Sequence, residues 1–124
     1  MTHATEHEEQ VTVVQWAAAH ERTEPRLKLL HAIPNAGAGA QKGQAGKMRA
    51  EGVKAGVPDL CLPVEDPRRG TGLYIEMKRR TGGRTSPAQQ WWHDALREQG
   101  YRVEVCAGAD EAIEVLRDHL QMRE

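Results

Sequence analysis

The sequence predicts an α/β fold in which a mixed β-sheet is flanked by helices. Segments with helical periodicity alternate with short apolar runs that are typical of strands, so the expected order is α-β-α-β-β-α-β-α. Two of these runs, residues 59–62 and 73–78, are separated only by a polar turn rich in Pro and Gly, which indicates a β-hairpin. A length of 124 residues fits one domain, residues 1–124, with a single hydrophobic core.

The first half of the chain is expected to contain two helices and one strand. Residues 5–20 predict a helix, because Thr5 and Glu8 form a capping-box pattern and an apolar stripe follows. The stripe consists of Val13, Val14, Trp16 and Ala17. Residues 27–33 predict a strand that runs into a glycine-rich loop. Residues 43–54 predict a short helix, weakened by glycines, that ends at Gly56.

In the second half, the hairpin is expected to have a long polar turn over residues 63–72 with a mobile tip. Ser86 and Pro87 then form a strong helix start, an N-cap followed by proline at the first helical position. That helix is expected to end near Gln99. A strand over residues 101–106 and an amphipathic helix over residues 110–122 complete the chain. The apolar stripe of the last helix consists of Ile113, Leu116 and Leu120.

Composition excludes several classes of protein. The chain is 39% hydrophobic and 28% charged, as soluble proteins are, and no apolar run approaches the roughly 20 residues of a membrane helix. The acidic N-terminus is unlike a signal peptide, so the expected location is cytoplasmic, in the host cell if the protein is phage-encoded. Cys61 and Cys106 lack metal-ligand spacing and are expected to be small buried residues. The scattered histidines argue against zinc, and the glycine clusters do not form a nucleotide-binding loop.

Charge is unevenly distributed along the chain. The net charge is −1, but residues 42–84 hold ten Lys or Arg against five acids, while the segments on both sides are acidic. A basic band of this kind could contact a nucleic-acid backbone, although a charge run is more often a solvated face. The candidate phosphate contacts are Lys42, Lys47, Arg49, Lys54, Arg79, Arg80 and Arg84.

The hairpin carries the chemistry. Because side chains alternate along a strand, Glu76 and Lys78 point to one face and Ile75 and Met77 to the other. Asp59, at the start of the opposing strand, could join the first pair. Two carboxylates could hold a hard cation such as Mg²⁺, with the backbone carbonyl of Met77 as a further ligand, and the lysine could orient or deprotonate a water. Taken alone, Glu-x-Lys is weak evidence, because such a pair is common on exposed strands.

Pro58-Asp59 followed 17 residues later by Glu76-Met77-Lys78 resembles the signature of the PD-(D/E)XK nuclease superfamily. Further segments are similar to its VRR-NUC group, especially to small stand-alone members of phage type. These segments are Ile33-Pro34-Asn35, the run from Glu51 to Leu60, Tyr74-Ile75 before Glu76, and Ser86-Pro87-Ala88-Gln89. The resemblance extends from about Glu6 to Leu120.

The resemblance implies a restriction-endonuclease-like core and a metal-dependent deoxyribonuclease using Mg²⁺ or Mn²⁺. It implies that Asp59 and Glu76 bind the metal, that Lys78 is catalytic, and that Gln89 supports the site from the following helix. It also implies an acid on the first helix, for which Glu6 is the first candidate and Glu9 the alternative. Gln90, next to Gln89, is equivalent in chemistry.

By analogy, the group implies structure-selective cleavage of branched DNA, such as flaps or four-way (Holliday) junctions in DNA repair, by a homodimer. Two rival hypotheses stand beside it: a DNA-binding module with this fold but no cleavage activity, and an α/β interaction protein whose hairpin charges are only solvated. Trp91 and Trp92 could stack on bases, but a tryptophan pair on an amphipathic helix more often has at least one member in the core.

Overall fold

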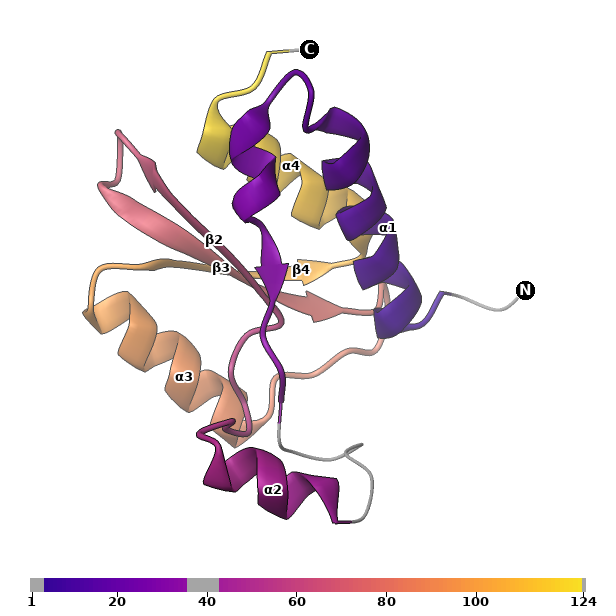
Figure 1. Ribbon diagram of the computed structural model, residues 1–124, viewed down its shortest axis with the longest axis vertical. Coiled ribbons are helices and arrows are strands. Elements are labelled where there is room, and N and C mark those ends of the chain that lie inside the picture. Colours follow the sequence, from indigo (N-terminus) through magenta and orange to yellow (C-terminus); the bar gives the residue numbers. More distant parts are fainter. Residues whose placement is uncertain (1–3, 36–42, 124) are drawn as a thin grey trace.

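The computed structural model describes residues 4–35 and 43–123, and its helices and strands follow the predicted order (Figure 1). The elements are α1 (Glu6–His20), the 3-10 helix η1 (Pro25–Leu29), β1 (His31–Ala32), α2 (Gln44–Ala50), β2 (Leu60–Asp66), β3 (Thr71–Lys78), α3 (Pro87–Glu98), β4 (Arg102–Ala107) and α4 (Ala109–Leu120). Within the described residues, no helix is long and apolar enough to span a membrane.

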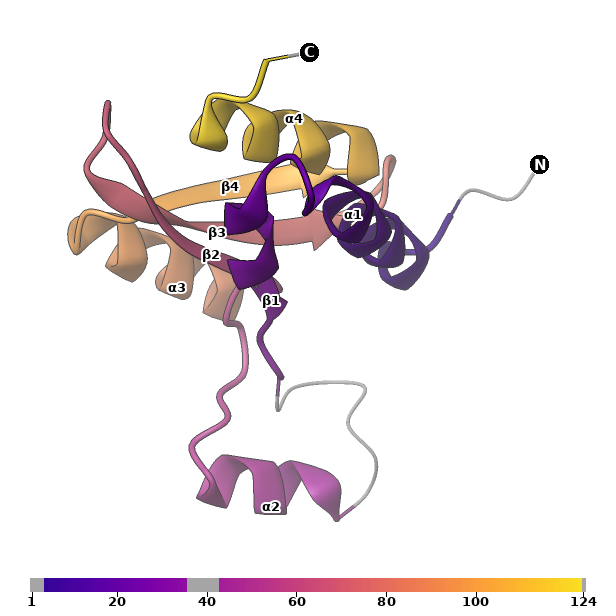
Figure 2. The same cartoon turned by 45° about the horizontal axis from the view of Figure 1, so that its top comes forward.

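The strands form a mixed sheet in the order β1-β2-β3-β4. β1, β2 and β3 pair antiparallel, whereas β3 and β4 pair parallel, joined by a crossover through α3. Helices α1 and α4 cover one face of the sheet and α3 covers the other (Figure 2). The α/β class with helices on both sides of a mixed sheet is therefore confirmed.

The core lies between the sheet and the helices α1 and α4. Each leucine buried there contributes about 2 kcal/mol by leaving water. The largest apolar side chains of this core are Val13, Leu27, Leu60, Leu62, Leu73, Ile75, Met77, Leu116 and Leu120. Ile75 and Met77 belong to it because they alternate with Glu76 and Lys78, which point to the opposite face, beneath α3.

Both strong helix starts are confirmed. Thr5 Oγ1 accepts a hydrogen bond from Glu8 N at 3.1 Å, and Glu8 Oε1 accepts one from Thr5 N at 2.9 Å. Ser86 and Gln89 form the same reciprocal capping box at the start of α3. A cap of this kind stabilises a helix by about 1 kcal/mol, so these two helix starts are fixed by local sequence.

The strand predicted over residues 27–33 is confirmed only for His31–Ala32. Its first part is the 3-10 helix η1, and only His31 and Ala32 pair with β2. Pro25 presets a helical φ in the first turn, and the Glu24 carboxylate accepts hydrogen bonds from the backbone and side chain of Arg26. The apolar run does contribute to the core, but through Leu27 of the 3-10 helix rather than through alternating strand residues.

The predicted helix over residues 43–54 is shorter than expected. It ends at Ala50, and Gly52, with φ +100°, turns the chain away. Gly56 therefore does not end this helix. None of the α2 side chains is fully buried, and α2 lies apart from the sheet, on the side of α3 (Figures 1 and 2).

Neither Trp91 nor Trp92 is buried, so the expectation that at least one lies in the core is wrong. Trp91 is 64% exposed and Trp92 is half-buried against the segment before β2. Cys106 is buried as expected, Cys61 is half-buried, and both are free thiols.

The long hairpin turn predicted over residues 63–72 is also wrong. β2 continues to Asp66 and β3 begins at Thr71, so the turn is short. A register shift between Leu62 and Asp66 accommodates Pro63, which has no N–H to donate. The strands thereby keep pairing up to the tip.

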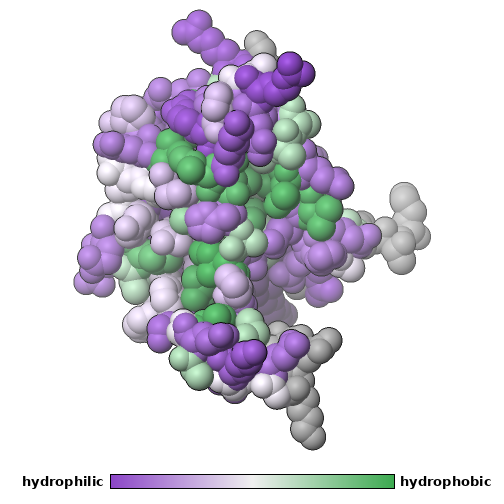
Figure 3. Space-filling model, viewed as in Figure 1, coloured by the Kyte–Doolittle hydropathy of each residue, from purple (hydrophilic) through white to green (hydrophobic). Residues whose placement is uncertain are grey.

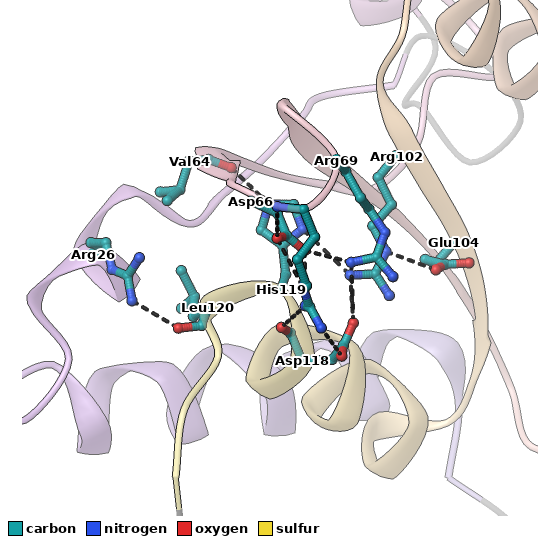
Figure 4. Close-up of polar contacts among 10 residues, drawn as sticks. Arg26, Val64, Asp66, Arg69, Arg102, Glu104, Asp118, His119 and Leu120 are labelled. Atoms are coloured by element: carbon teal, nitrogen blue, oxygen red, sulfur yellow. Dashed lines mark hydrogen bonds and ion pairs between the residues drawn. The ribbon is translucent and has the colours of Figure 1, made fainter.

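A network of charges at this tip ties the hairpin to the end of α4 (Figure 4). The fully buried Asp66 carboxylate pairs with Arg68 at 2.9 Å and with Arg69, and Arg68 also pairs with Asp118 of α4 at 3.3 Å. Asp118 pairs in addition with Arg102 of β4 at 3.0 Å. Hydrogen bonds from Arg68, and then from Arg69, hold the pKa of Asp66 well below its usual range.

We expect Asp66→Asn to lower the urea midpoint strongly at neutral pH and much less in acid. A carboxyl with a lowered pKa contributes stability above its unfolded pKa of about 3.9, and this contribution is lost as pH falls toward the lower folded value. The measurement is the urea midpoint of the wild type and of the variant at about pH 7 and about pH 2.5. The difference between the two proteins should be larger at about pH 7.

The matched control is Glu65→Gln, which removes an exposed carboxyl next to Asp66 and should leave the midpoint nearly unchanged at both pH values. An equal loss for Asp66→Asn at both pH values would show that the ionised carboxylate is not what holds the tip.

Candidate active site

The candidate site lies between β3 and the first two turns of α3. Glu76 and Lys78 point from β3 toward α3, and Gln89 and His93, one helical turn apart, point back. Glu76 is only 2% exposed and Lys78 only 7%, so the two charges do not lie on an exposed strand face. Buried charges require partners, and the residues of α3 provide them.

Gln89 connects the other members of the site. Its Nε2 donates to Glu76 Oε2 at 3.3 Å, and its Oε1 accepts from Lys78 Nζ at 2.9 Å and from Ser86 N at 2.9 Å. The side chain that caps α3 is thus the one that holds the carboxyl and the ammonium. Gln90 instead donates to Asp94 at 2.9 Å on the exposed side of the helix. Of the two glutamines, Gln89 is the one the structure brings to the site.

Asp59 and Glu76 form a carboxyl pair at the start of the hairpin. Asp59 Oδ2 accepts a hydrogen bond of 2.7 Å from Met77 N, and the carboxyl lies close enough to Glu76 to affect its pKa. Burial, followed by the neighbouring carboxyl of Asp59, raises the pKa of Glu76 to about 9. At neutral pH the pair therefore retains a proton, because two adjacent carboxylates repel each other in a poorly solvated place.

His93 is a member of the site that sequence reasoning missed. It is 1% exposed, and its Nε2 lies 3.4 Å from Glu76 Oε1. Burial, followed by the charges of Arg97 and Lys78, lowers its pKa, so the ring is neutral. The available signal was its spacing, since His93 follows Gln89 by four residues and shares its helix face.

The two acids of the first helix occupy different places. Glu9 is buried, with Oε2 2.8 Å from Arg80 Nε and Oε1 3.3 Å from Ala109 N at the start of α4. It therefore joins α1 to β3 and α4. Glu6 is exposed and lines the same pocket as Lys78 and Gln89, near enough that its charge contributes to the raised pKa of Glu76. The geometry brings Glu6, not Glu9, to the site.

That pocket opens the site to solvent. Besides Glu6, Lys78 and Gln89 it is lined by Asn35, Gly56 and Arg84. Gly56 forms its wall and touches the start of α3: a Cβ at this position would lie 2.8 Å from the backbone carbon of Ala88. Its φ of +89° also favours glycine. This close approach holds the segment before Asp59 against α3.

The donor set fits a hard divalent cation that keeps several waters. Within residues 4–35 and 43–123, no three or more His, Cys, Asp or Glu side chains gather as a complete metal cage. Mg²⁺ does not need one, because it commonly binds one or two carboxylates and fills its remaining positions with water and phosphate oxygens. The Asp59–Glu76 pair offers two carboxyl groups of this kind, and a bound cation would take the place of the proton between them.

Basic residues surround this region unevenly. Lys47 and Lys54 are exposed on and after α2, Arg79 is exposed beyond β3, and Arg84 lines the pocket. Arg49, on α2, is exposed. Arg80 differs, because its guanidinium pairs with Glu9 and lies 3.7 Å from Asp110. We therefore assign Arg80 to the fold. Lys42 lies outside the described residues.

Comparisons with known proteins agree on one family. The family model of the VRR-NUC domain matches residues 1–110. A solved structure described as a VRR_NUC domain protein superposes with a TM-score of 0.76 at 28% sequence identity, covering 99% of this chain and 93% of that one. No curated protein gives a significant match.

We expect Gly56→Ala to destabilise the protein more than Gly52→Ala. Both glycines have positive φ, but a Cβ at Gly52 would meet nothing within 4 Å, whereas a Cβ at Gly56 would collide with Ala88. Backbone strain should cost about 1 kcal/mol in either variant, and the collision about 2 kcal/mol more at Gly56. Urea unfolding of the two variants measures the difference; equal losses would mean that the contact with α3 is unimportant.

Proposed function

Because the chain belongs to the VRR-NUC domain family, we propose that it is a metal-dependent endonuclease that hydrolyses phosphodiester bonds in DNA. The single observation that carries the proposal is the Asp59–Glu76 carboxyl pair beside Lys78, a lysine that lines a pocket together with Glu6 and Gln89. In this proposal residues 1–124 act as one nuclease domain.

Asp59 and Glu76, with the Met77 carbonyl, would hold Mg²⁺ or Mn²⁺. In an extended strand the N–H and C=O of a residue point to the same side, and the Met77 N–H points at Asp59. Glu6, which lines the pocket, would help to hold the cation directly or through water. When bound, the cation supplies charge neutralisation at the scissile phosphate and acidifies a bound water.

Lys78 would orient the attacking water or stabilise the charge on a phosphate oxygen. Its stem is buried and its Nζ donates to Gln89 Oε1, so the ammonium has little freedom to move from its place beside the carboxyl pair. A positioned donor of this kind can orient a water or stabilise charge that develops on the phosphate. His93 and Gln89 keep the Glu76 carboxyl directed at the cation.

DNA would be bound through its backbone by Lys47, Arg49, Lys54, Arg79 and Arg84, and by Lys42 from outside the described residues. Such contacts provide affinity without sequence reading. We propose branched DNA, a flap or a four-way junction, as the substrate, and a homodimer for the junction, because two symmetric cuts require two sites.

The alternative is a DNA-binding module without cleavage activity. It shares the cations and the fold with the nuclease proposal, so only a cleavage assay separates the two.

The purified protein is expected to cut DNA only with Mg²⁺ or Mn²⁺, and chelation with EDTA should abolish cutting. Asp59→Ala and Lys78→Ala should each lower the rate by about 100-fold or more, because they remove a metal ligand and the positioned ammonium. The substrates are plasmid, flap, fork, junction, duplex and single-stranded DNA, with Gln90→Ala as the matched control on the outer face of α3. Binding without metal-dependent cutting of any substrate would favour the non-cleaving module.

Glu6→Gln is expected to affect cleavage, whereas Glu9→Gln is expected to affect stability. Glu6→Gln should slow cleavage and leave the unfolding midpoint unchanged, since the residue is exposed and lines the pocket. Glu9→Gln should lower the midpoint, because it weakens the contacts with Arg80 and Ala109. Cleavage rates and urea midpoints of both variants provide the check. Slow cleavage by a fully stable Glu9→Gln variant would transfer the proposed role to Glu9.

A further inference from the structure

A second cavity, of about 340 Å³, lies next to the candidate active site. Apolar side chains make up most of its walls: Ile33, Pro34, Val53, Val57 and Trp92. Glu51 and Lys54 add one charge of each sign. Apolar surface extends down the middle of the molecule over β1 toward α2 (Figure 3), the region from which these side chains come.

The two cavities share a wall. Asn35 and Gly56 line the active-site pocket, while their chain neighbours Pro34 and Val57 line the second cavity. The second cavity and the active-site pocket are therefore lined by neighbouring residues of the same two chain segments, one before α2 and one before β2. A molecule bound at the active site would extend past this wall.

Trp92 is held in a fixed orientation. Its Nε1 donates to Ala55 O at 3.1 Å, and Trp91 packs edge-on against it with ring centroids 5.5 Å apart. Trp91 does not line the cavity and is 64% exposed. An indole secured in this way forms an aromatic wall that loses little conformational freedom when a flat group stacks on it.

We propose that this cavity binds an unpaired nucleobase of the DNA, stacked on Trp92, beside the phosphate that is cut. A base has flat apolar faces and a polar edge, which match the apolar and aromatic walls and the two charged side chains. Lys54 can donate to base carbonyl and ring-nitrogen acceptors, and Glu51 can accept from an exocyclic amino group. The inference rests on the proposed function, because it assumes that DNA occupies the adjoining pocket.

Charge favours DNA over an apolar peptide as the occupant. Lys54 lines the cavity, Lys47 is exposed on α2, and Arg84 lines the neighbouring active-site pocket. Phosphates on both sides of a stacked base would meet these cations. The cavity would make the protein prefer DNA with unpaired nucleotides at the cleavage site, as in a flap or fork.

The test is a binding experiment in EDTA, so that no cutting occurs. A fluorescent fork DNA is compared with forks in which an abasic residue replaces one nucleotide, moved stepwise through the branch. Wild-type affinity should fall about tenfold when the abasic residue reaches one particular position, the value expected for losing one stacked base. Trp92→Leu should bind the intact fork about tenfold more weakly than the wild type does, and an abasic residue at any position should not weaken its binding further. The comparison is a double-mutant cycle between protein and DNA.

Two further variants make the result independent of any folding role of Trp92. Val53→Phe fills the cavity from the opposite wall and should also abolish the abasic effect. Trp91→Ala should retain the abasic effect. If Trp91→Ala loses the abasic effect while Trp92→Leu keeps it, stacking occurs on the outer face of α3 and the proposal is wrong. DNA binding with no abasic effect at any position overturns the inference and leaves the nuclease proposal intact, as would be seen if the cavity served a peptide. Absence of all DNA binding overturns both.

Discussion

The candidate site depends on the close approach of two carboxyl groups, those of Asp59 and Glu76. Asp59 and Glu76 come from adjacent antiparallel strands, so their approach is set by the register that pairs Leu60 with Ile75. A slip of one residue would turn Glu76 into the core and Ile75 into the site. The core between the sheet and the helices α1 and α4 therefore does more than stabilise the fold. By holding Ile75 and Met77, it fixes which side chains face α3.

The buried carboxylates outside this pair, those of Glu9 and Asp66, support the structure. Glu9 with Arg80 joins segments far apart in the chain, and so does Arg68 with Asp118, whereas Asp66 pairs with Arg68 and Arg69 within the hairpin turn. Each of these carboxylates has a cationic partner in contact, and the pKa of each is lowered. Glu76 has a second carboxyl as its neighbour, and its pKa is raised. The direction of the shift separates the ion pairs that support the structure from the carboxyl that we propose as a metal ligand.

Sequence alone could predict the parts of the fold that depend on local interactions. Both capping boxes, the hairpin and the alternation along β3 are encoded within a few residues, and they bring Glu76, Lys78 and Gln89 together. The 3-10 helix at Leu27, the extension of β2 to Asp66 and the exposure of Trp91 depend on contacts with distant segments, which no local pattern records. The choice between Glu6 and Glu9 was of the same kind, since Arg80 and Ala109 become neighbours of Glu9 only in the folded chain.

The isolation of α2 has a consequence for how a protein of this kind can change over evolutionary time. None of its side chains is fully buried, and it lies apart from the sheet (Figure 2). Substitutions, insertions or deletions there disturb neither the core nor the register that aligns the carboxyl pair. Under the proposed function, substrate preference can therefore change through α2 and the adjoining cavity wall while β2 and β3 stay the same.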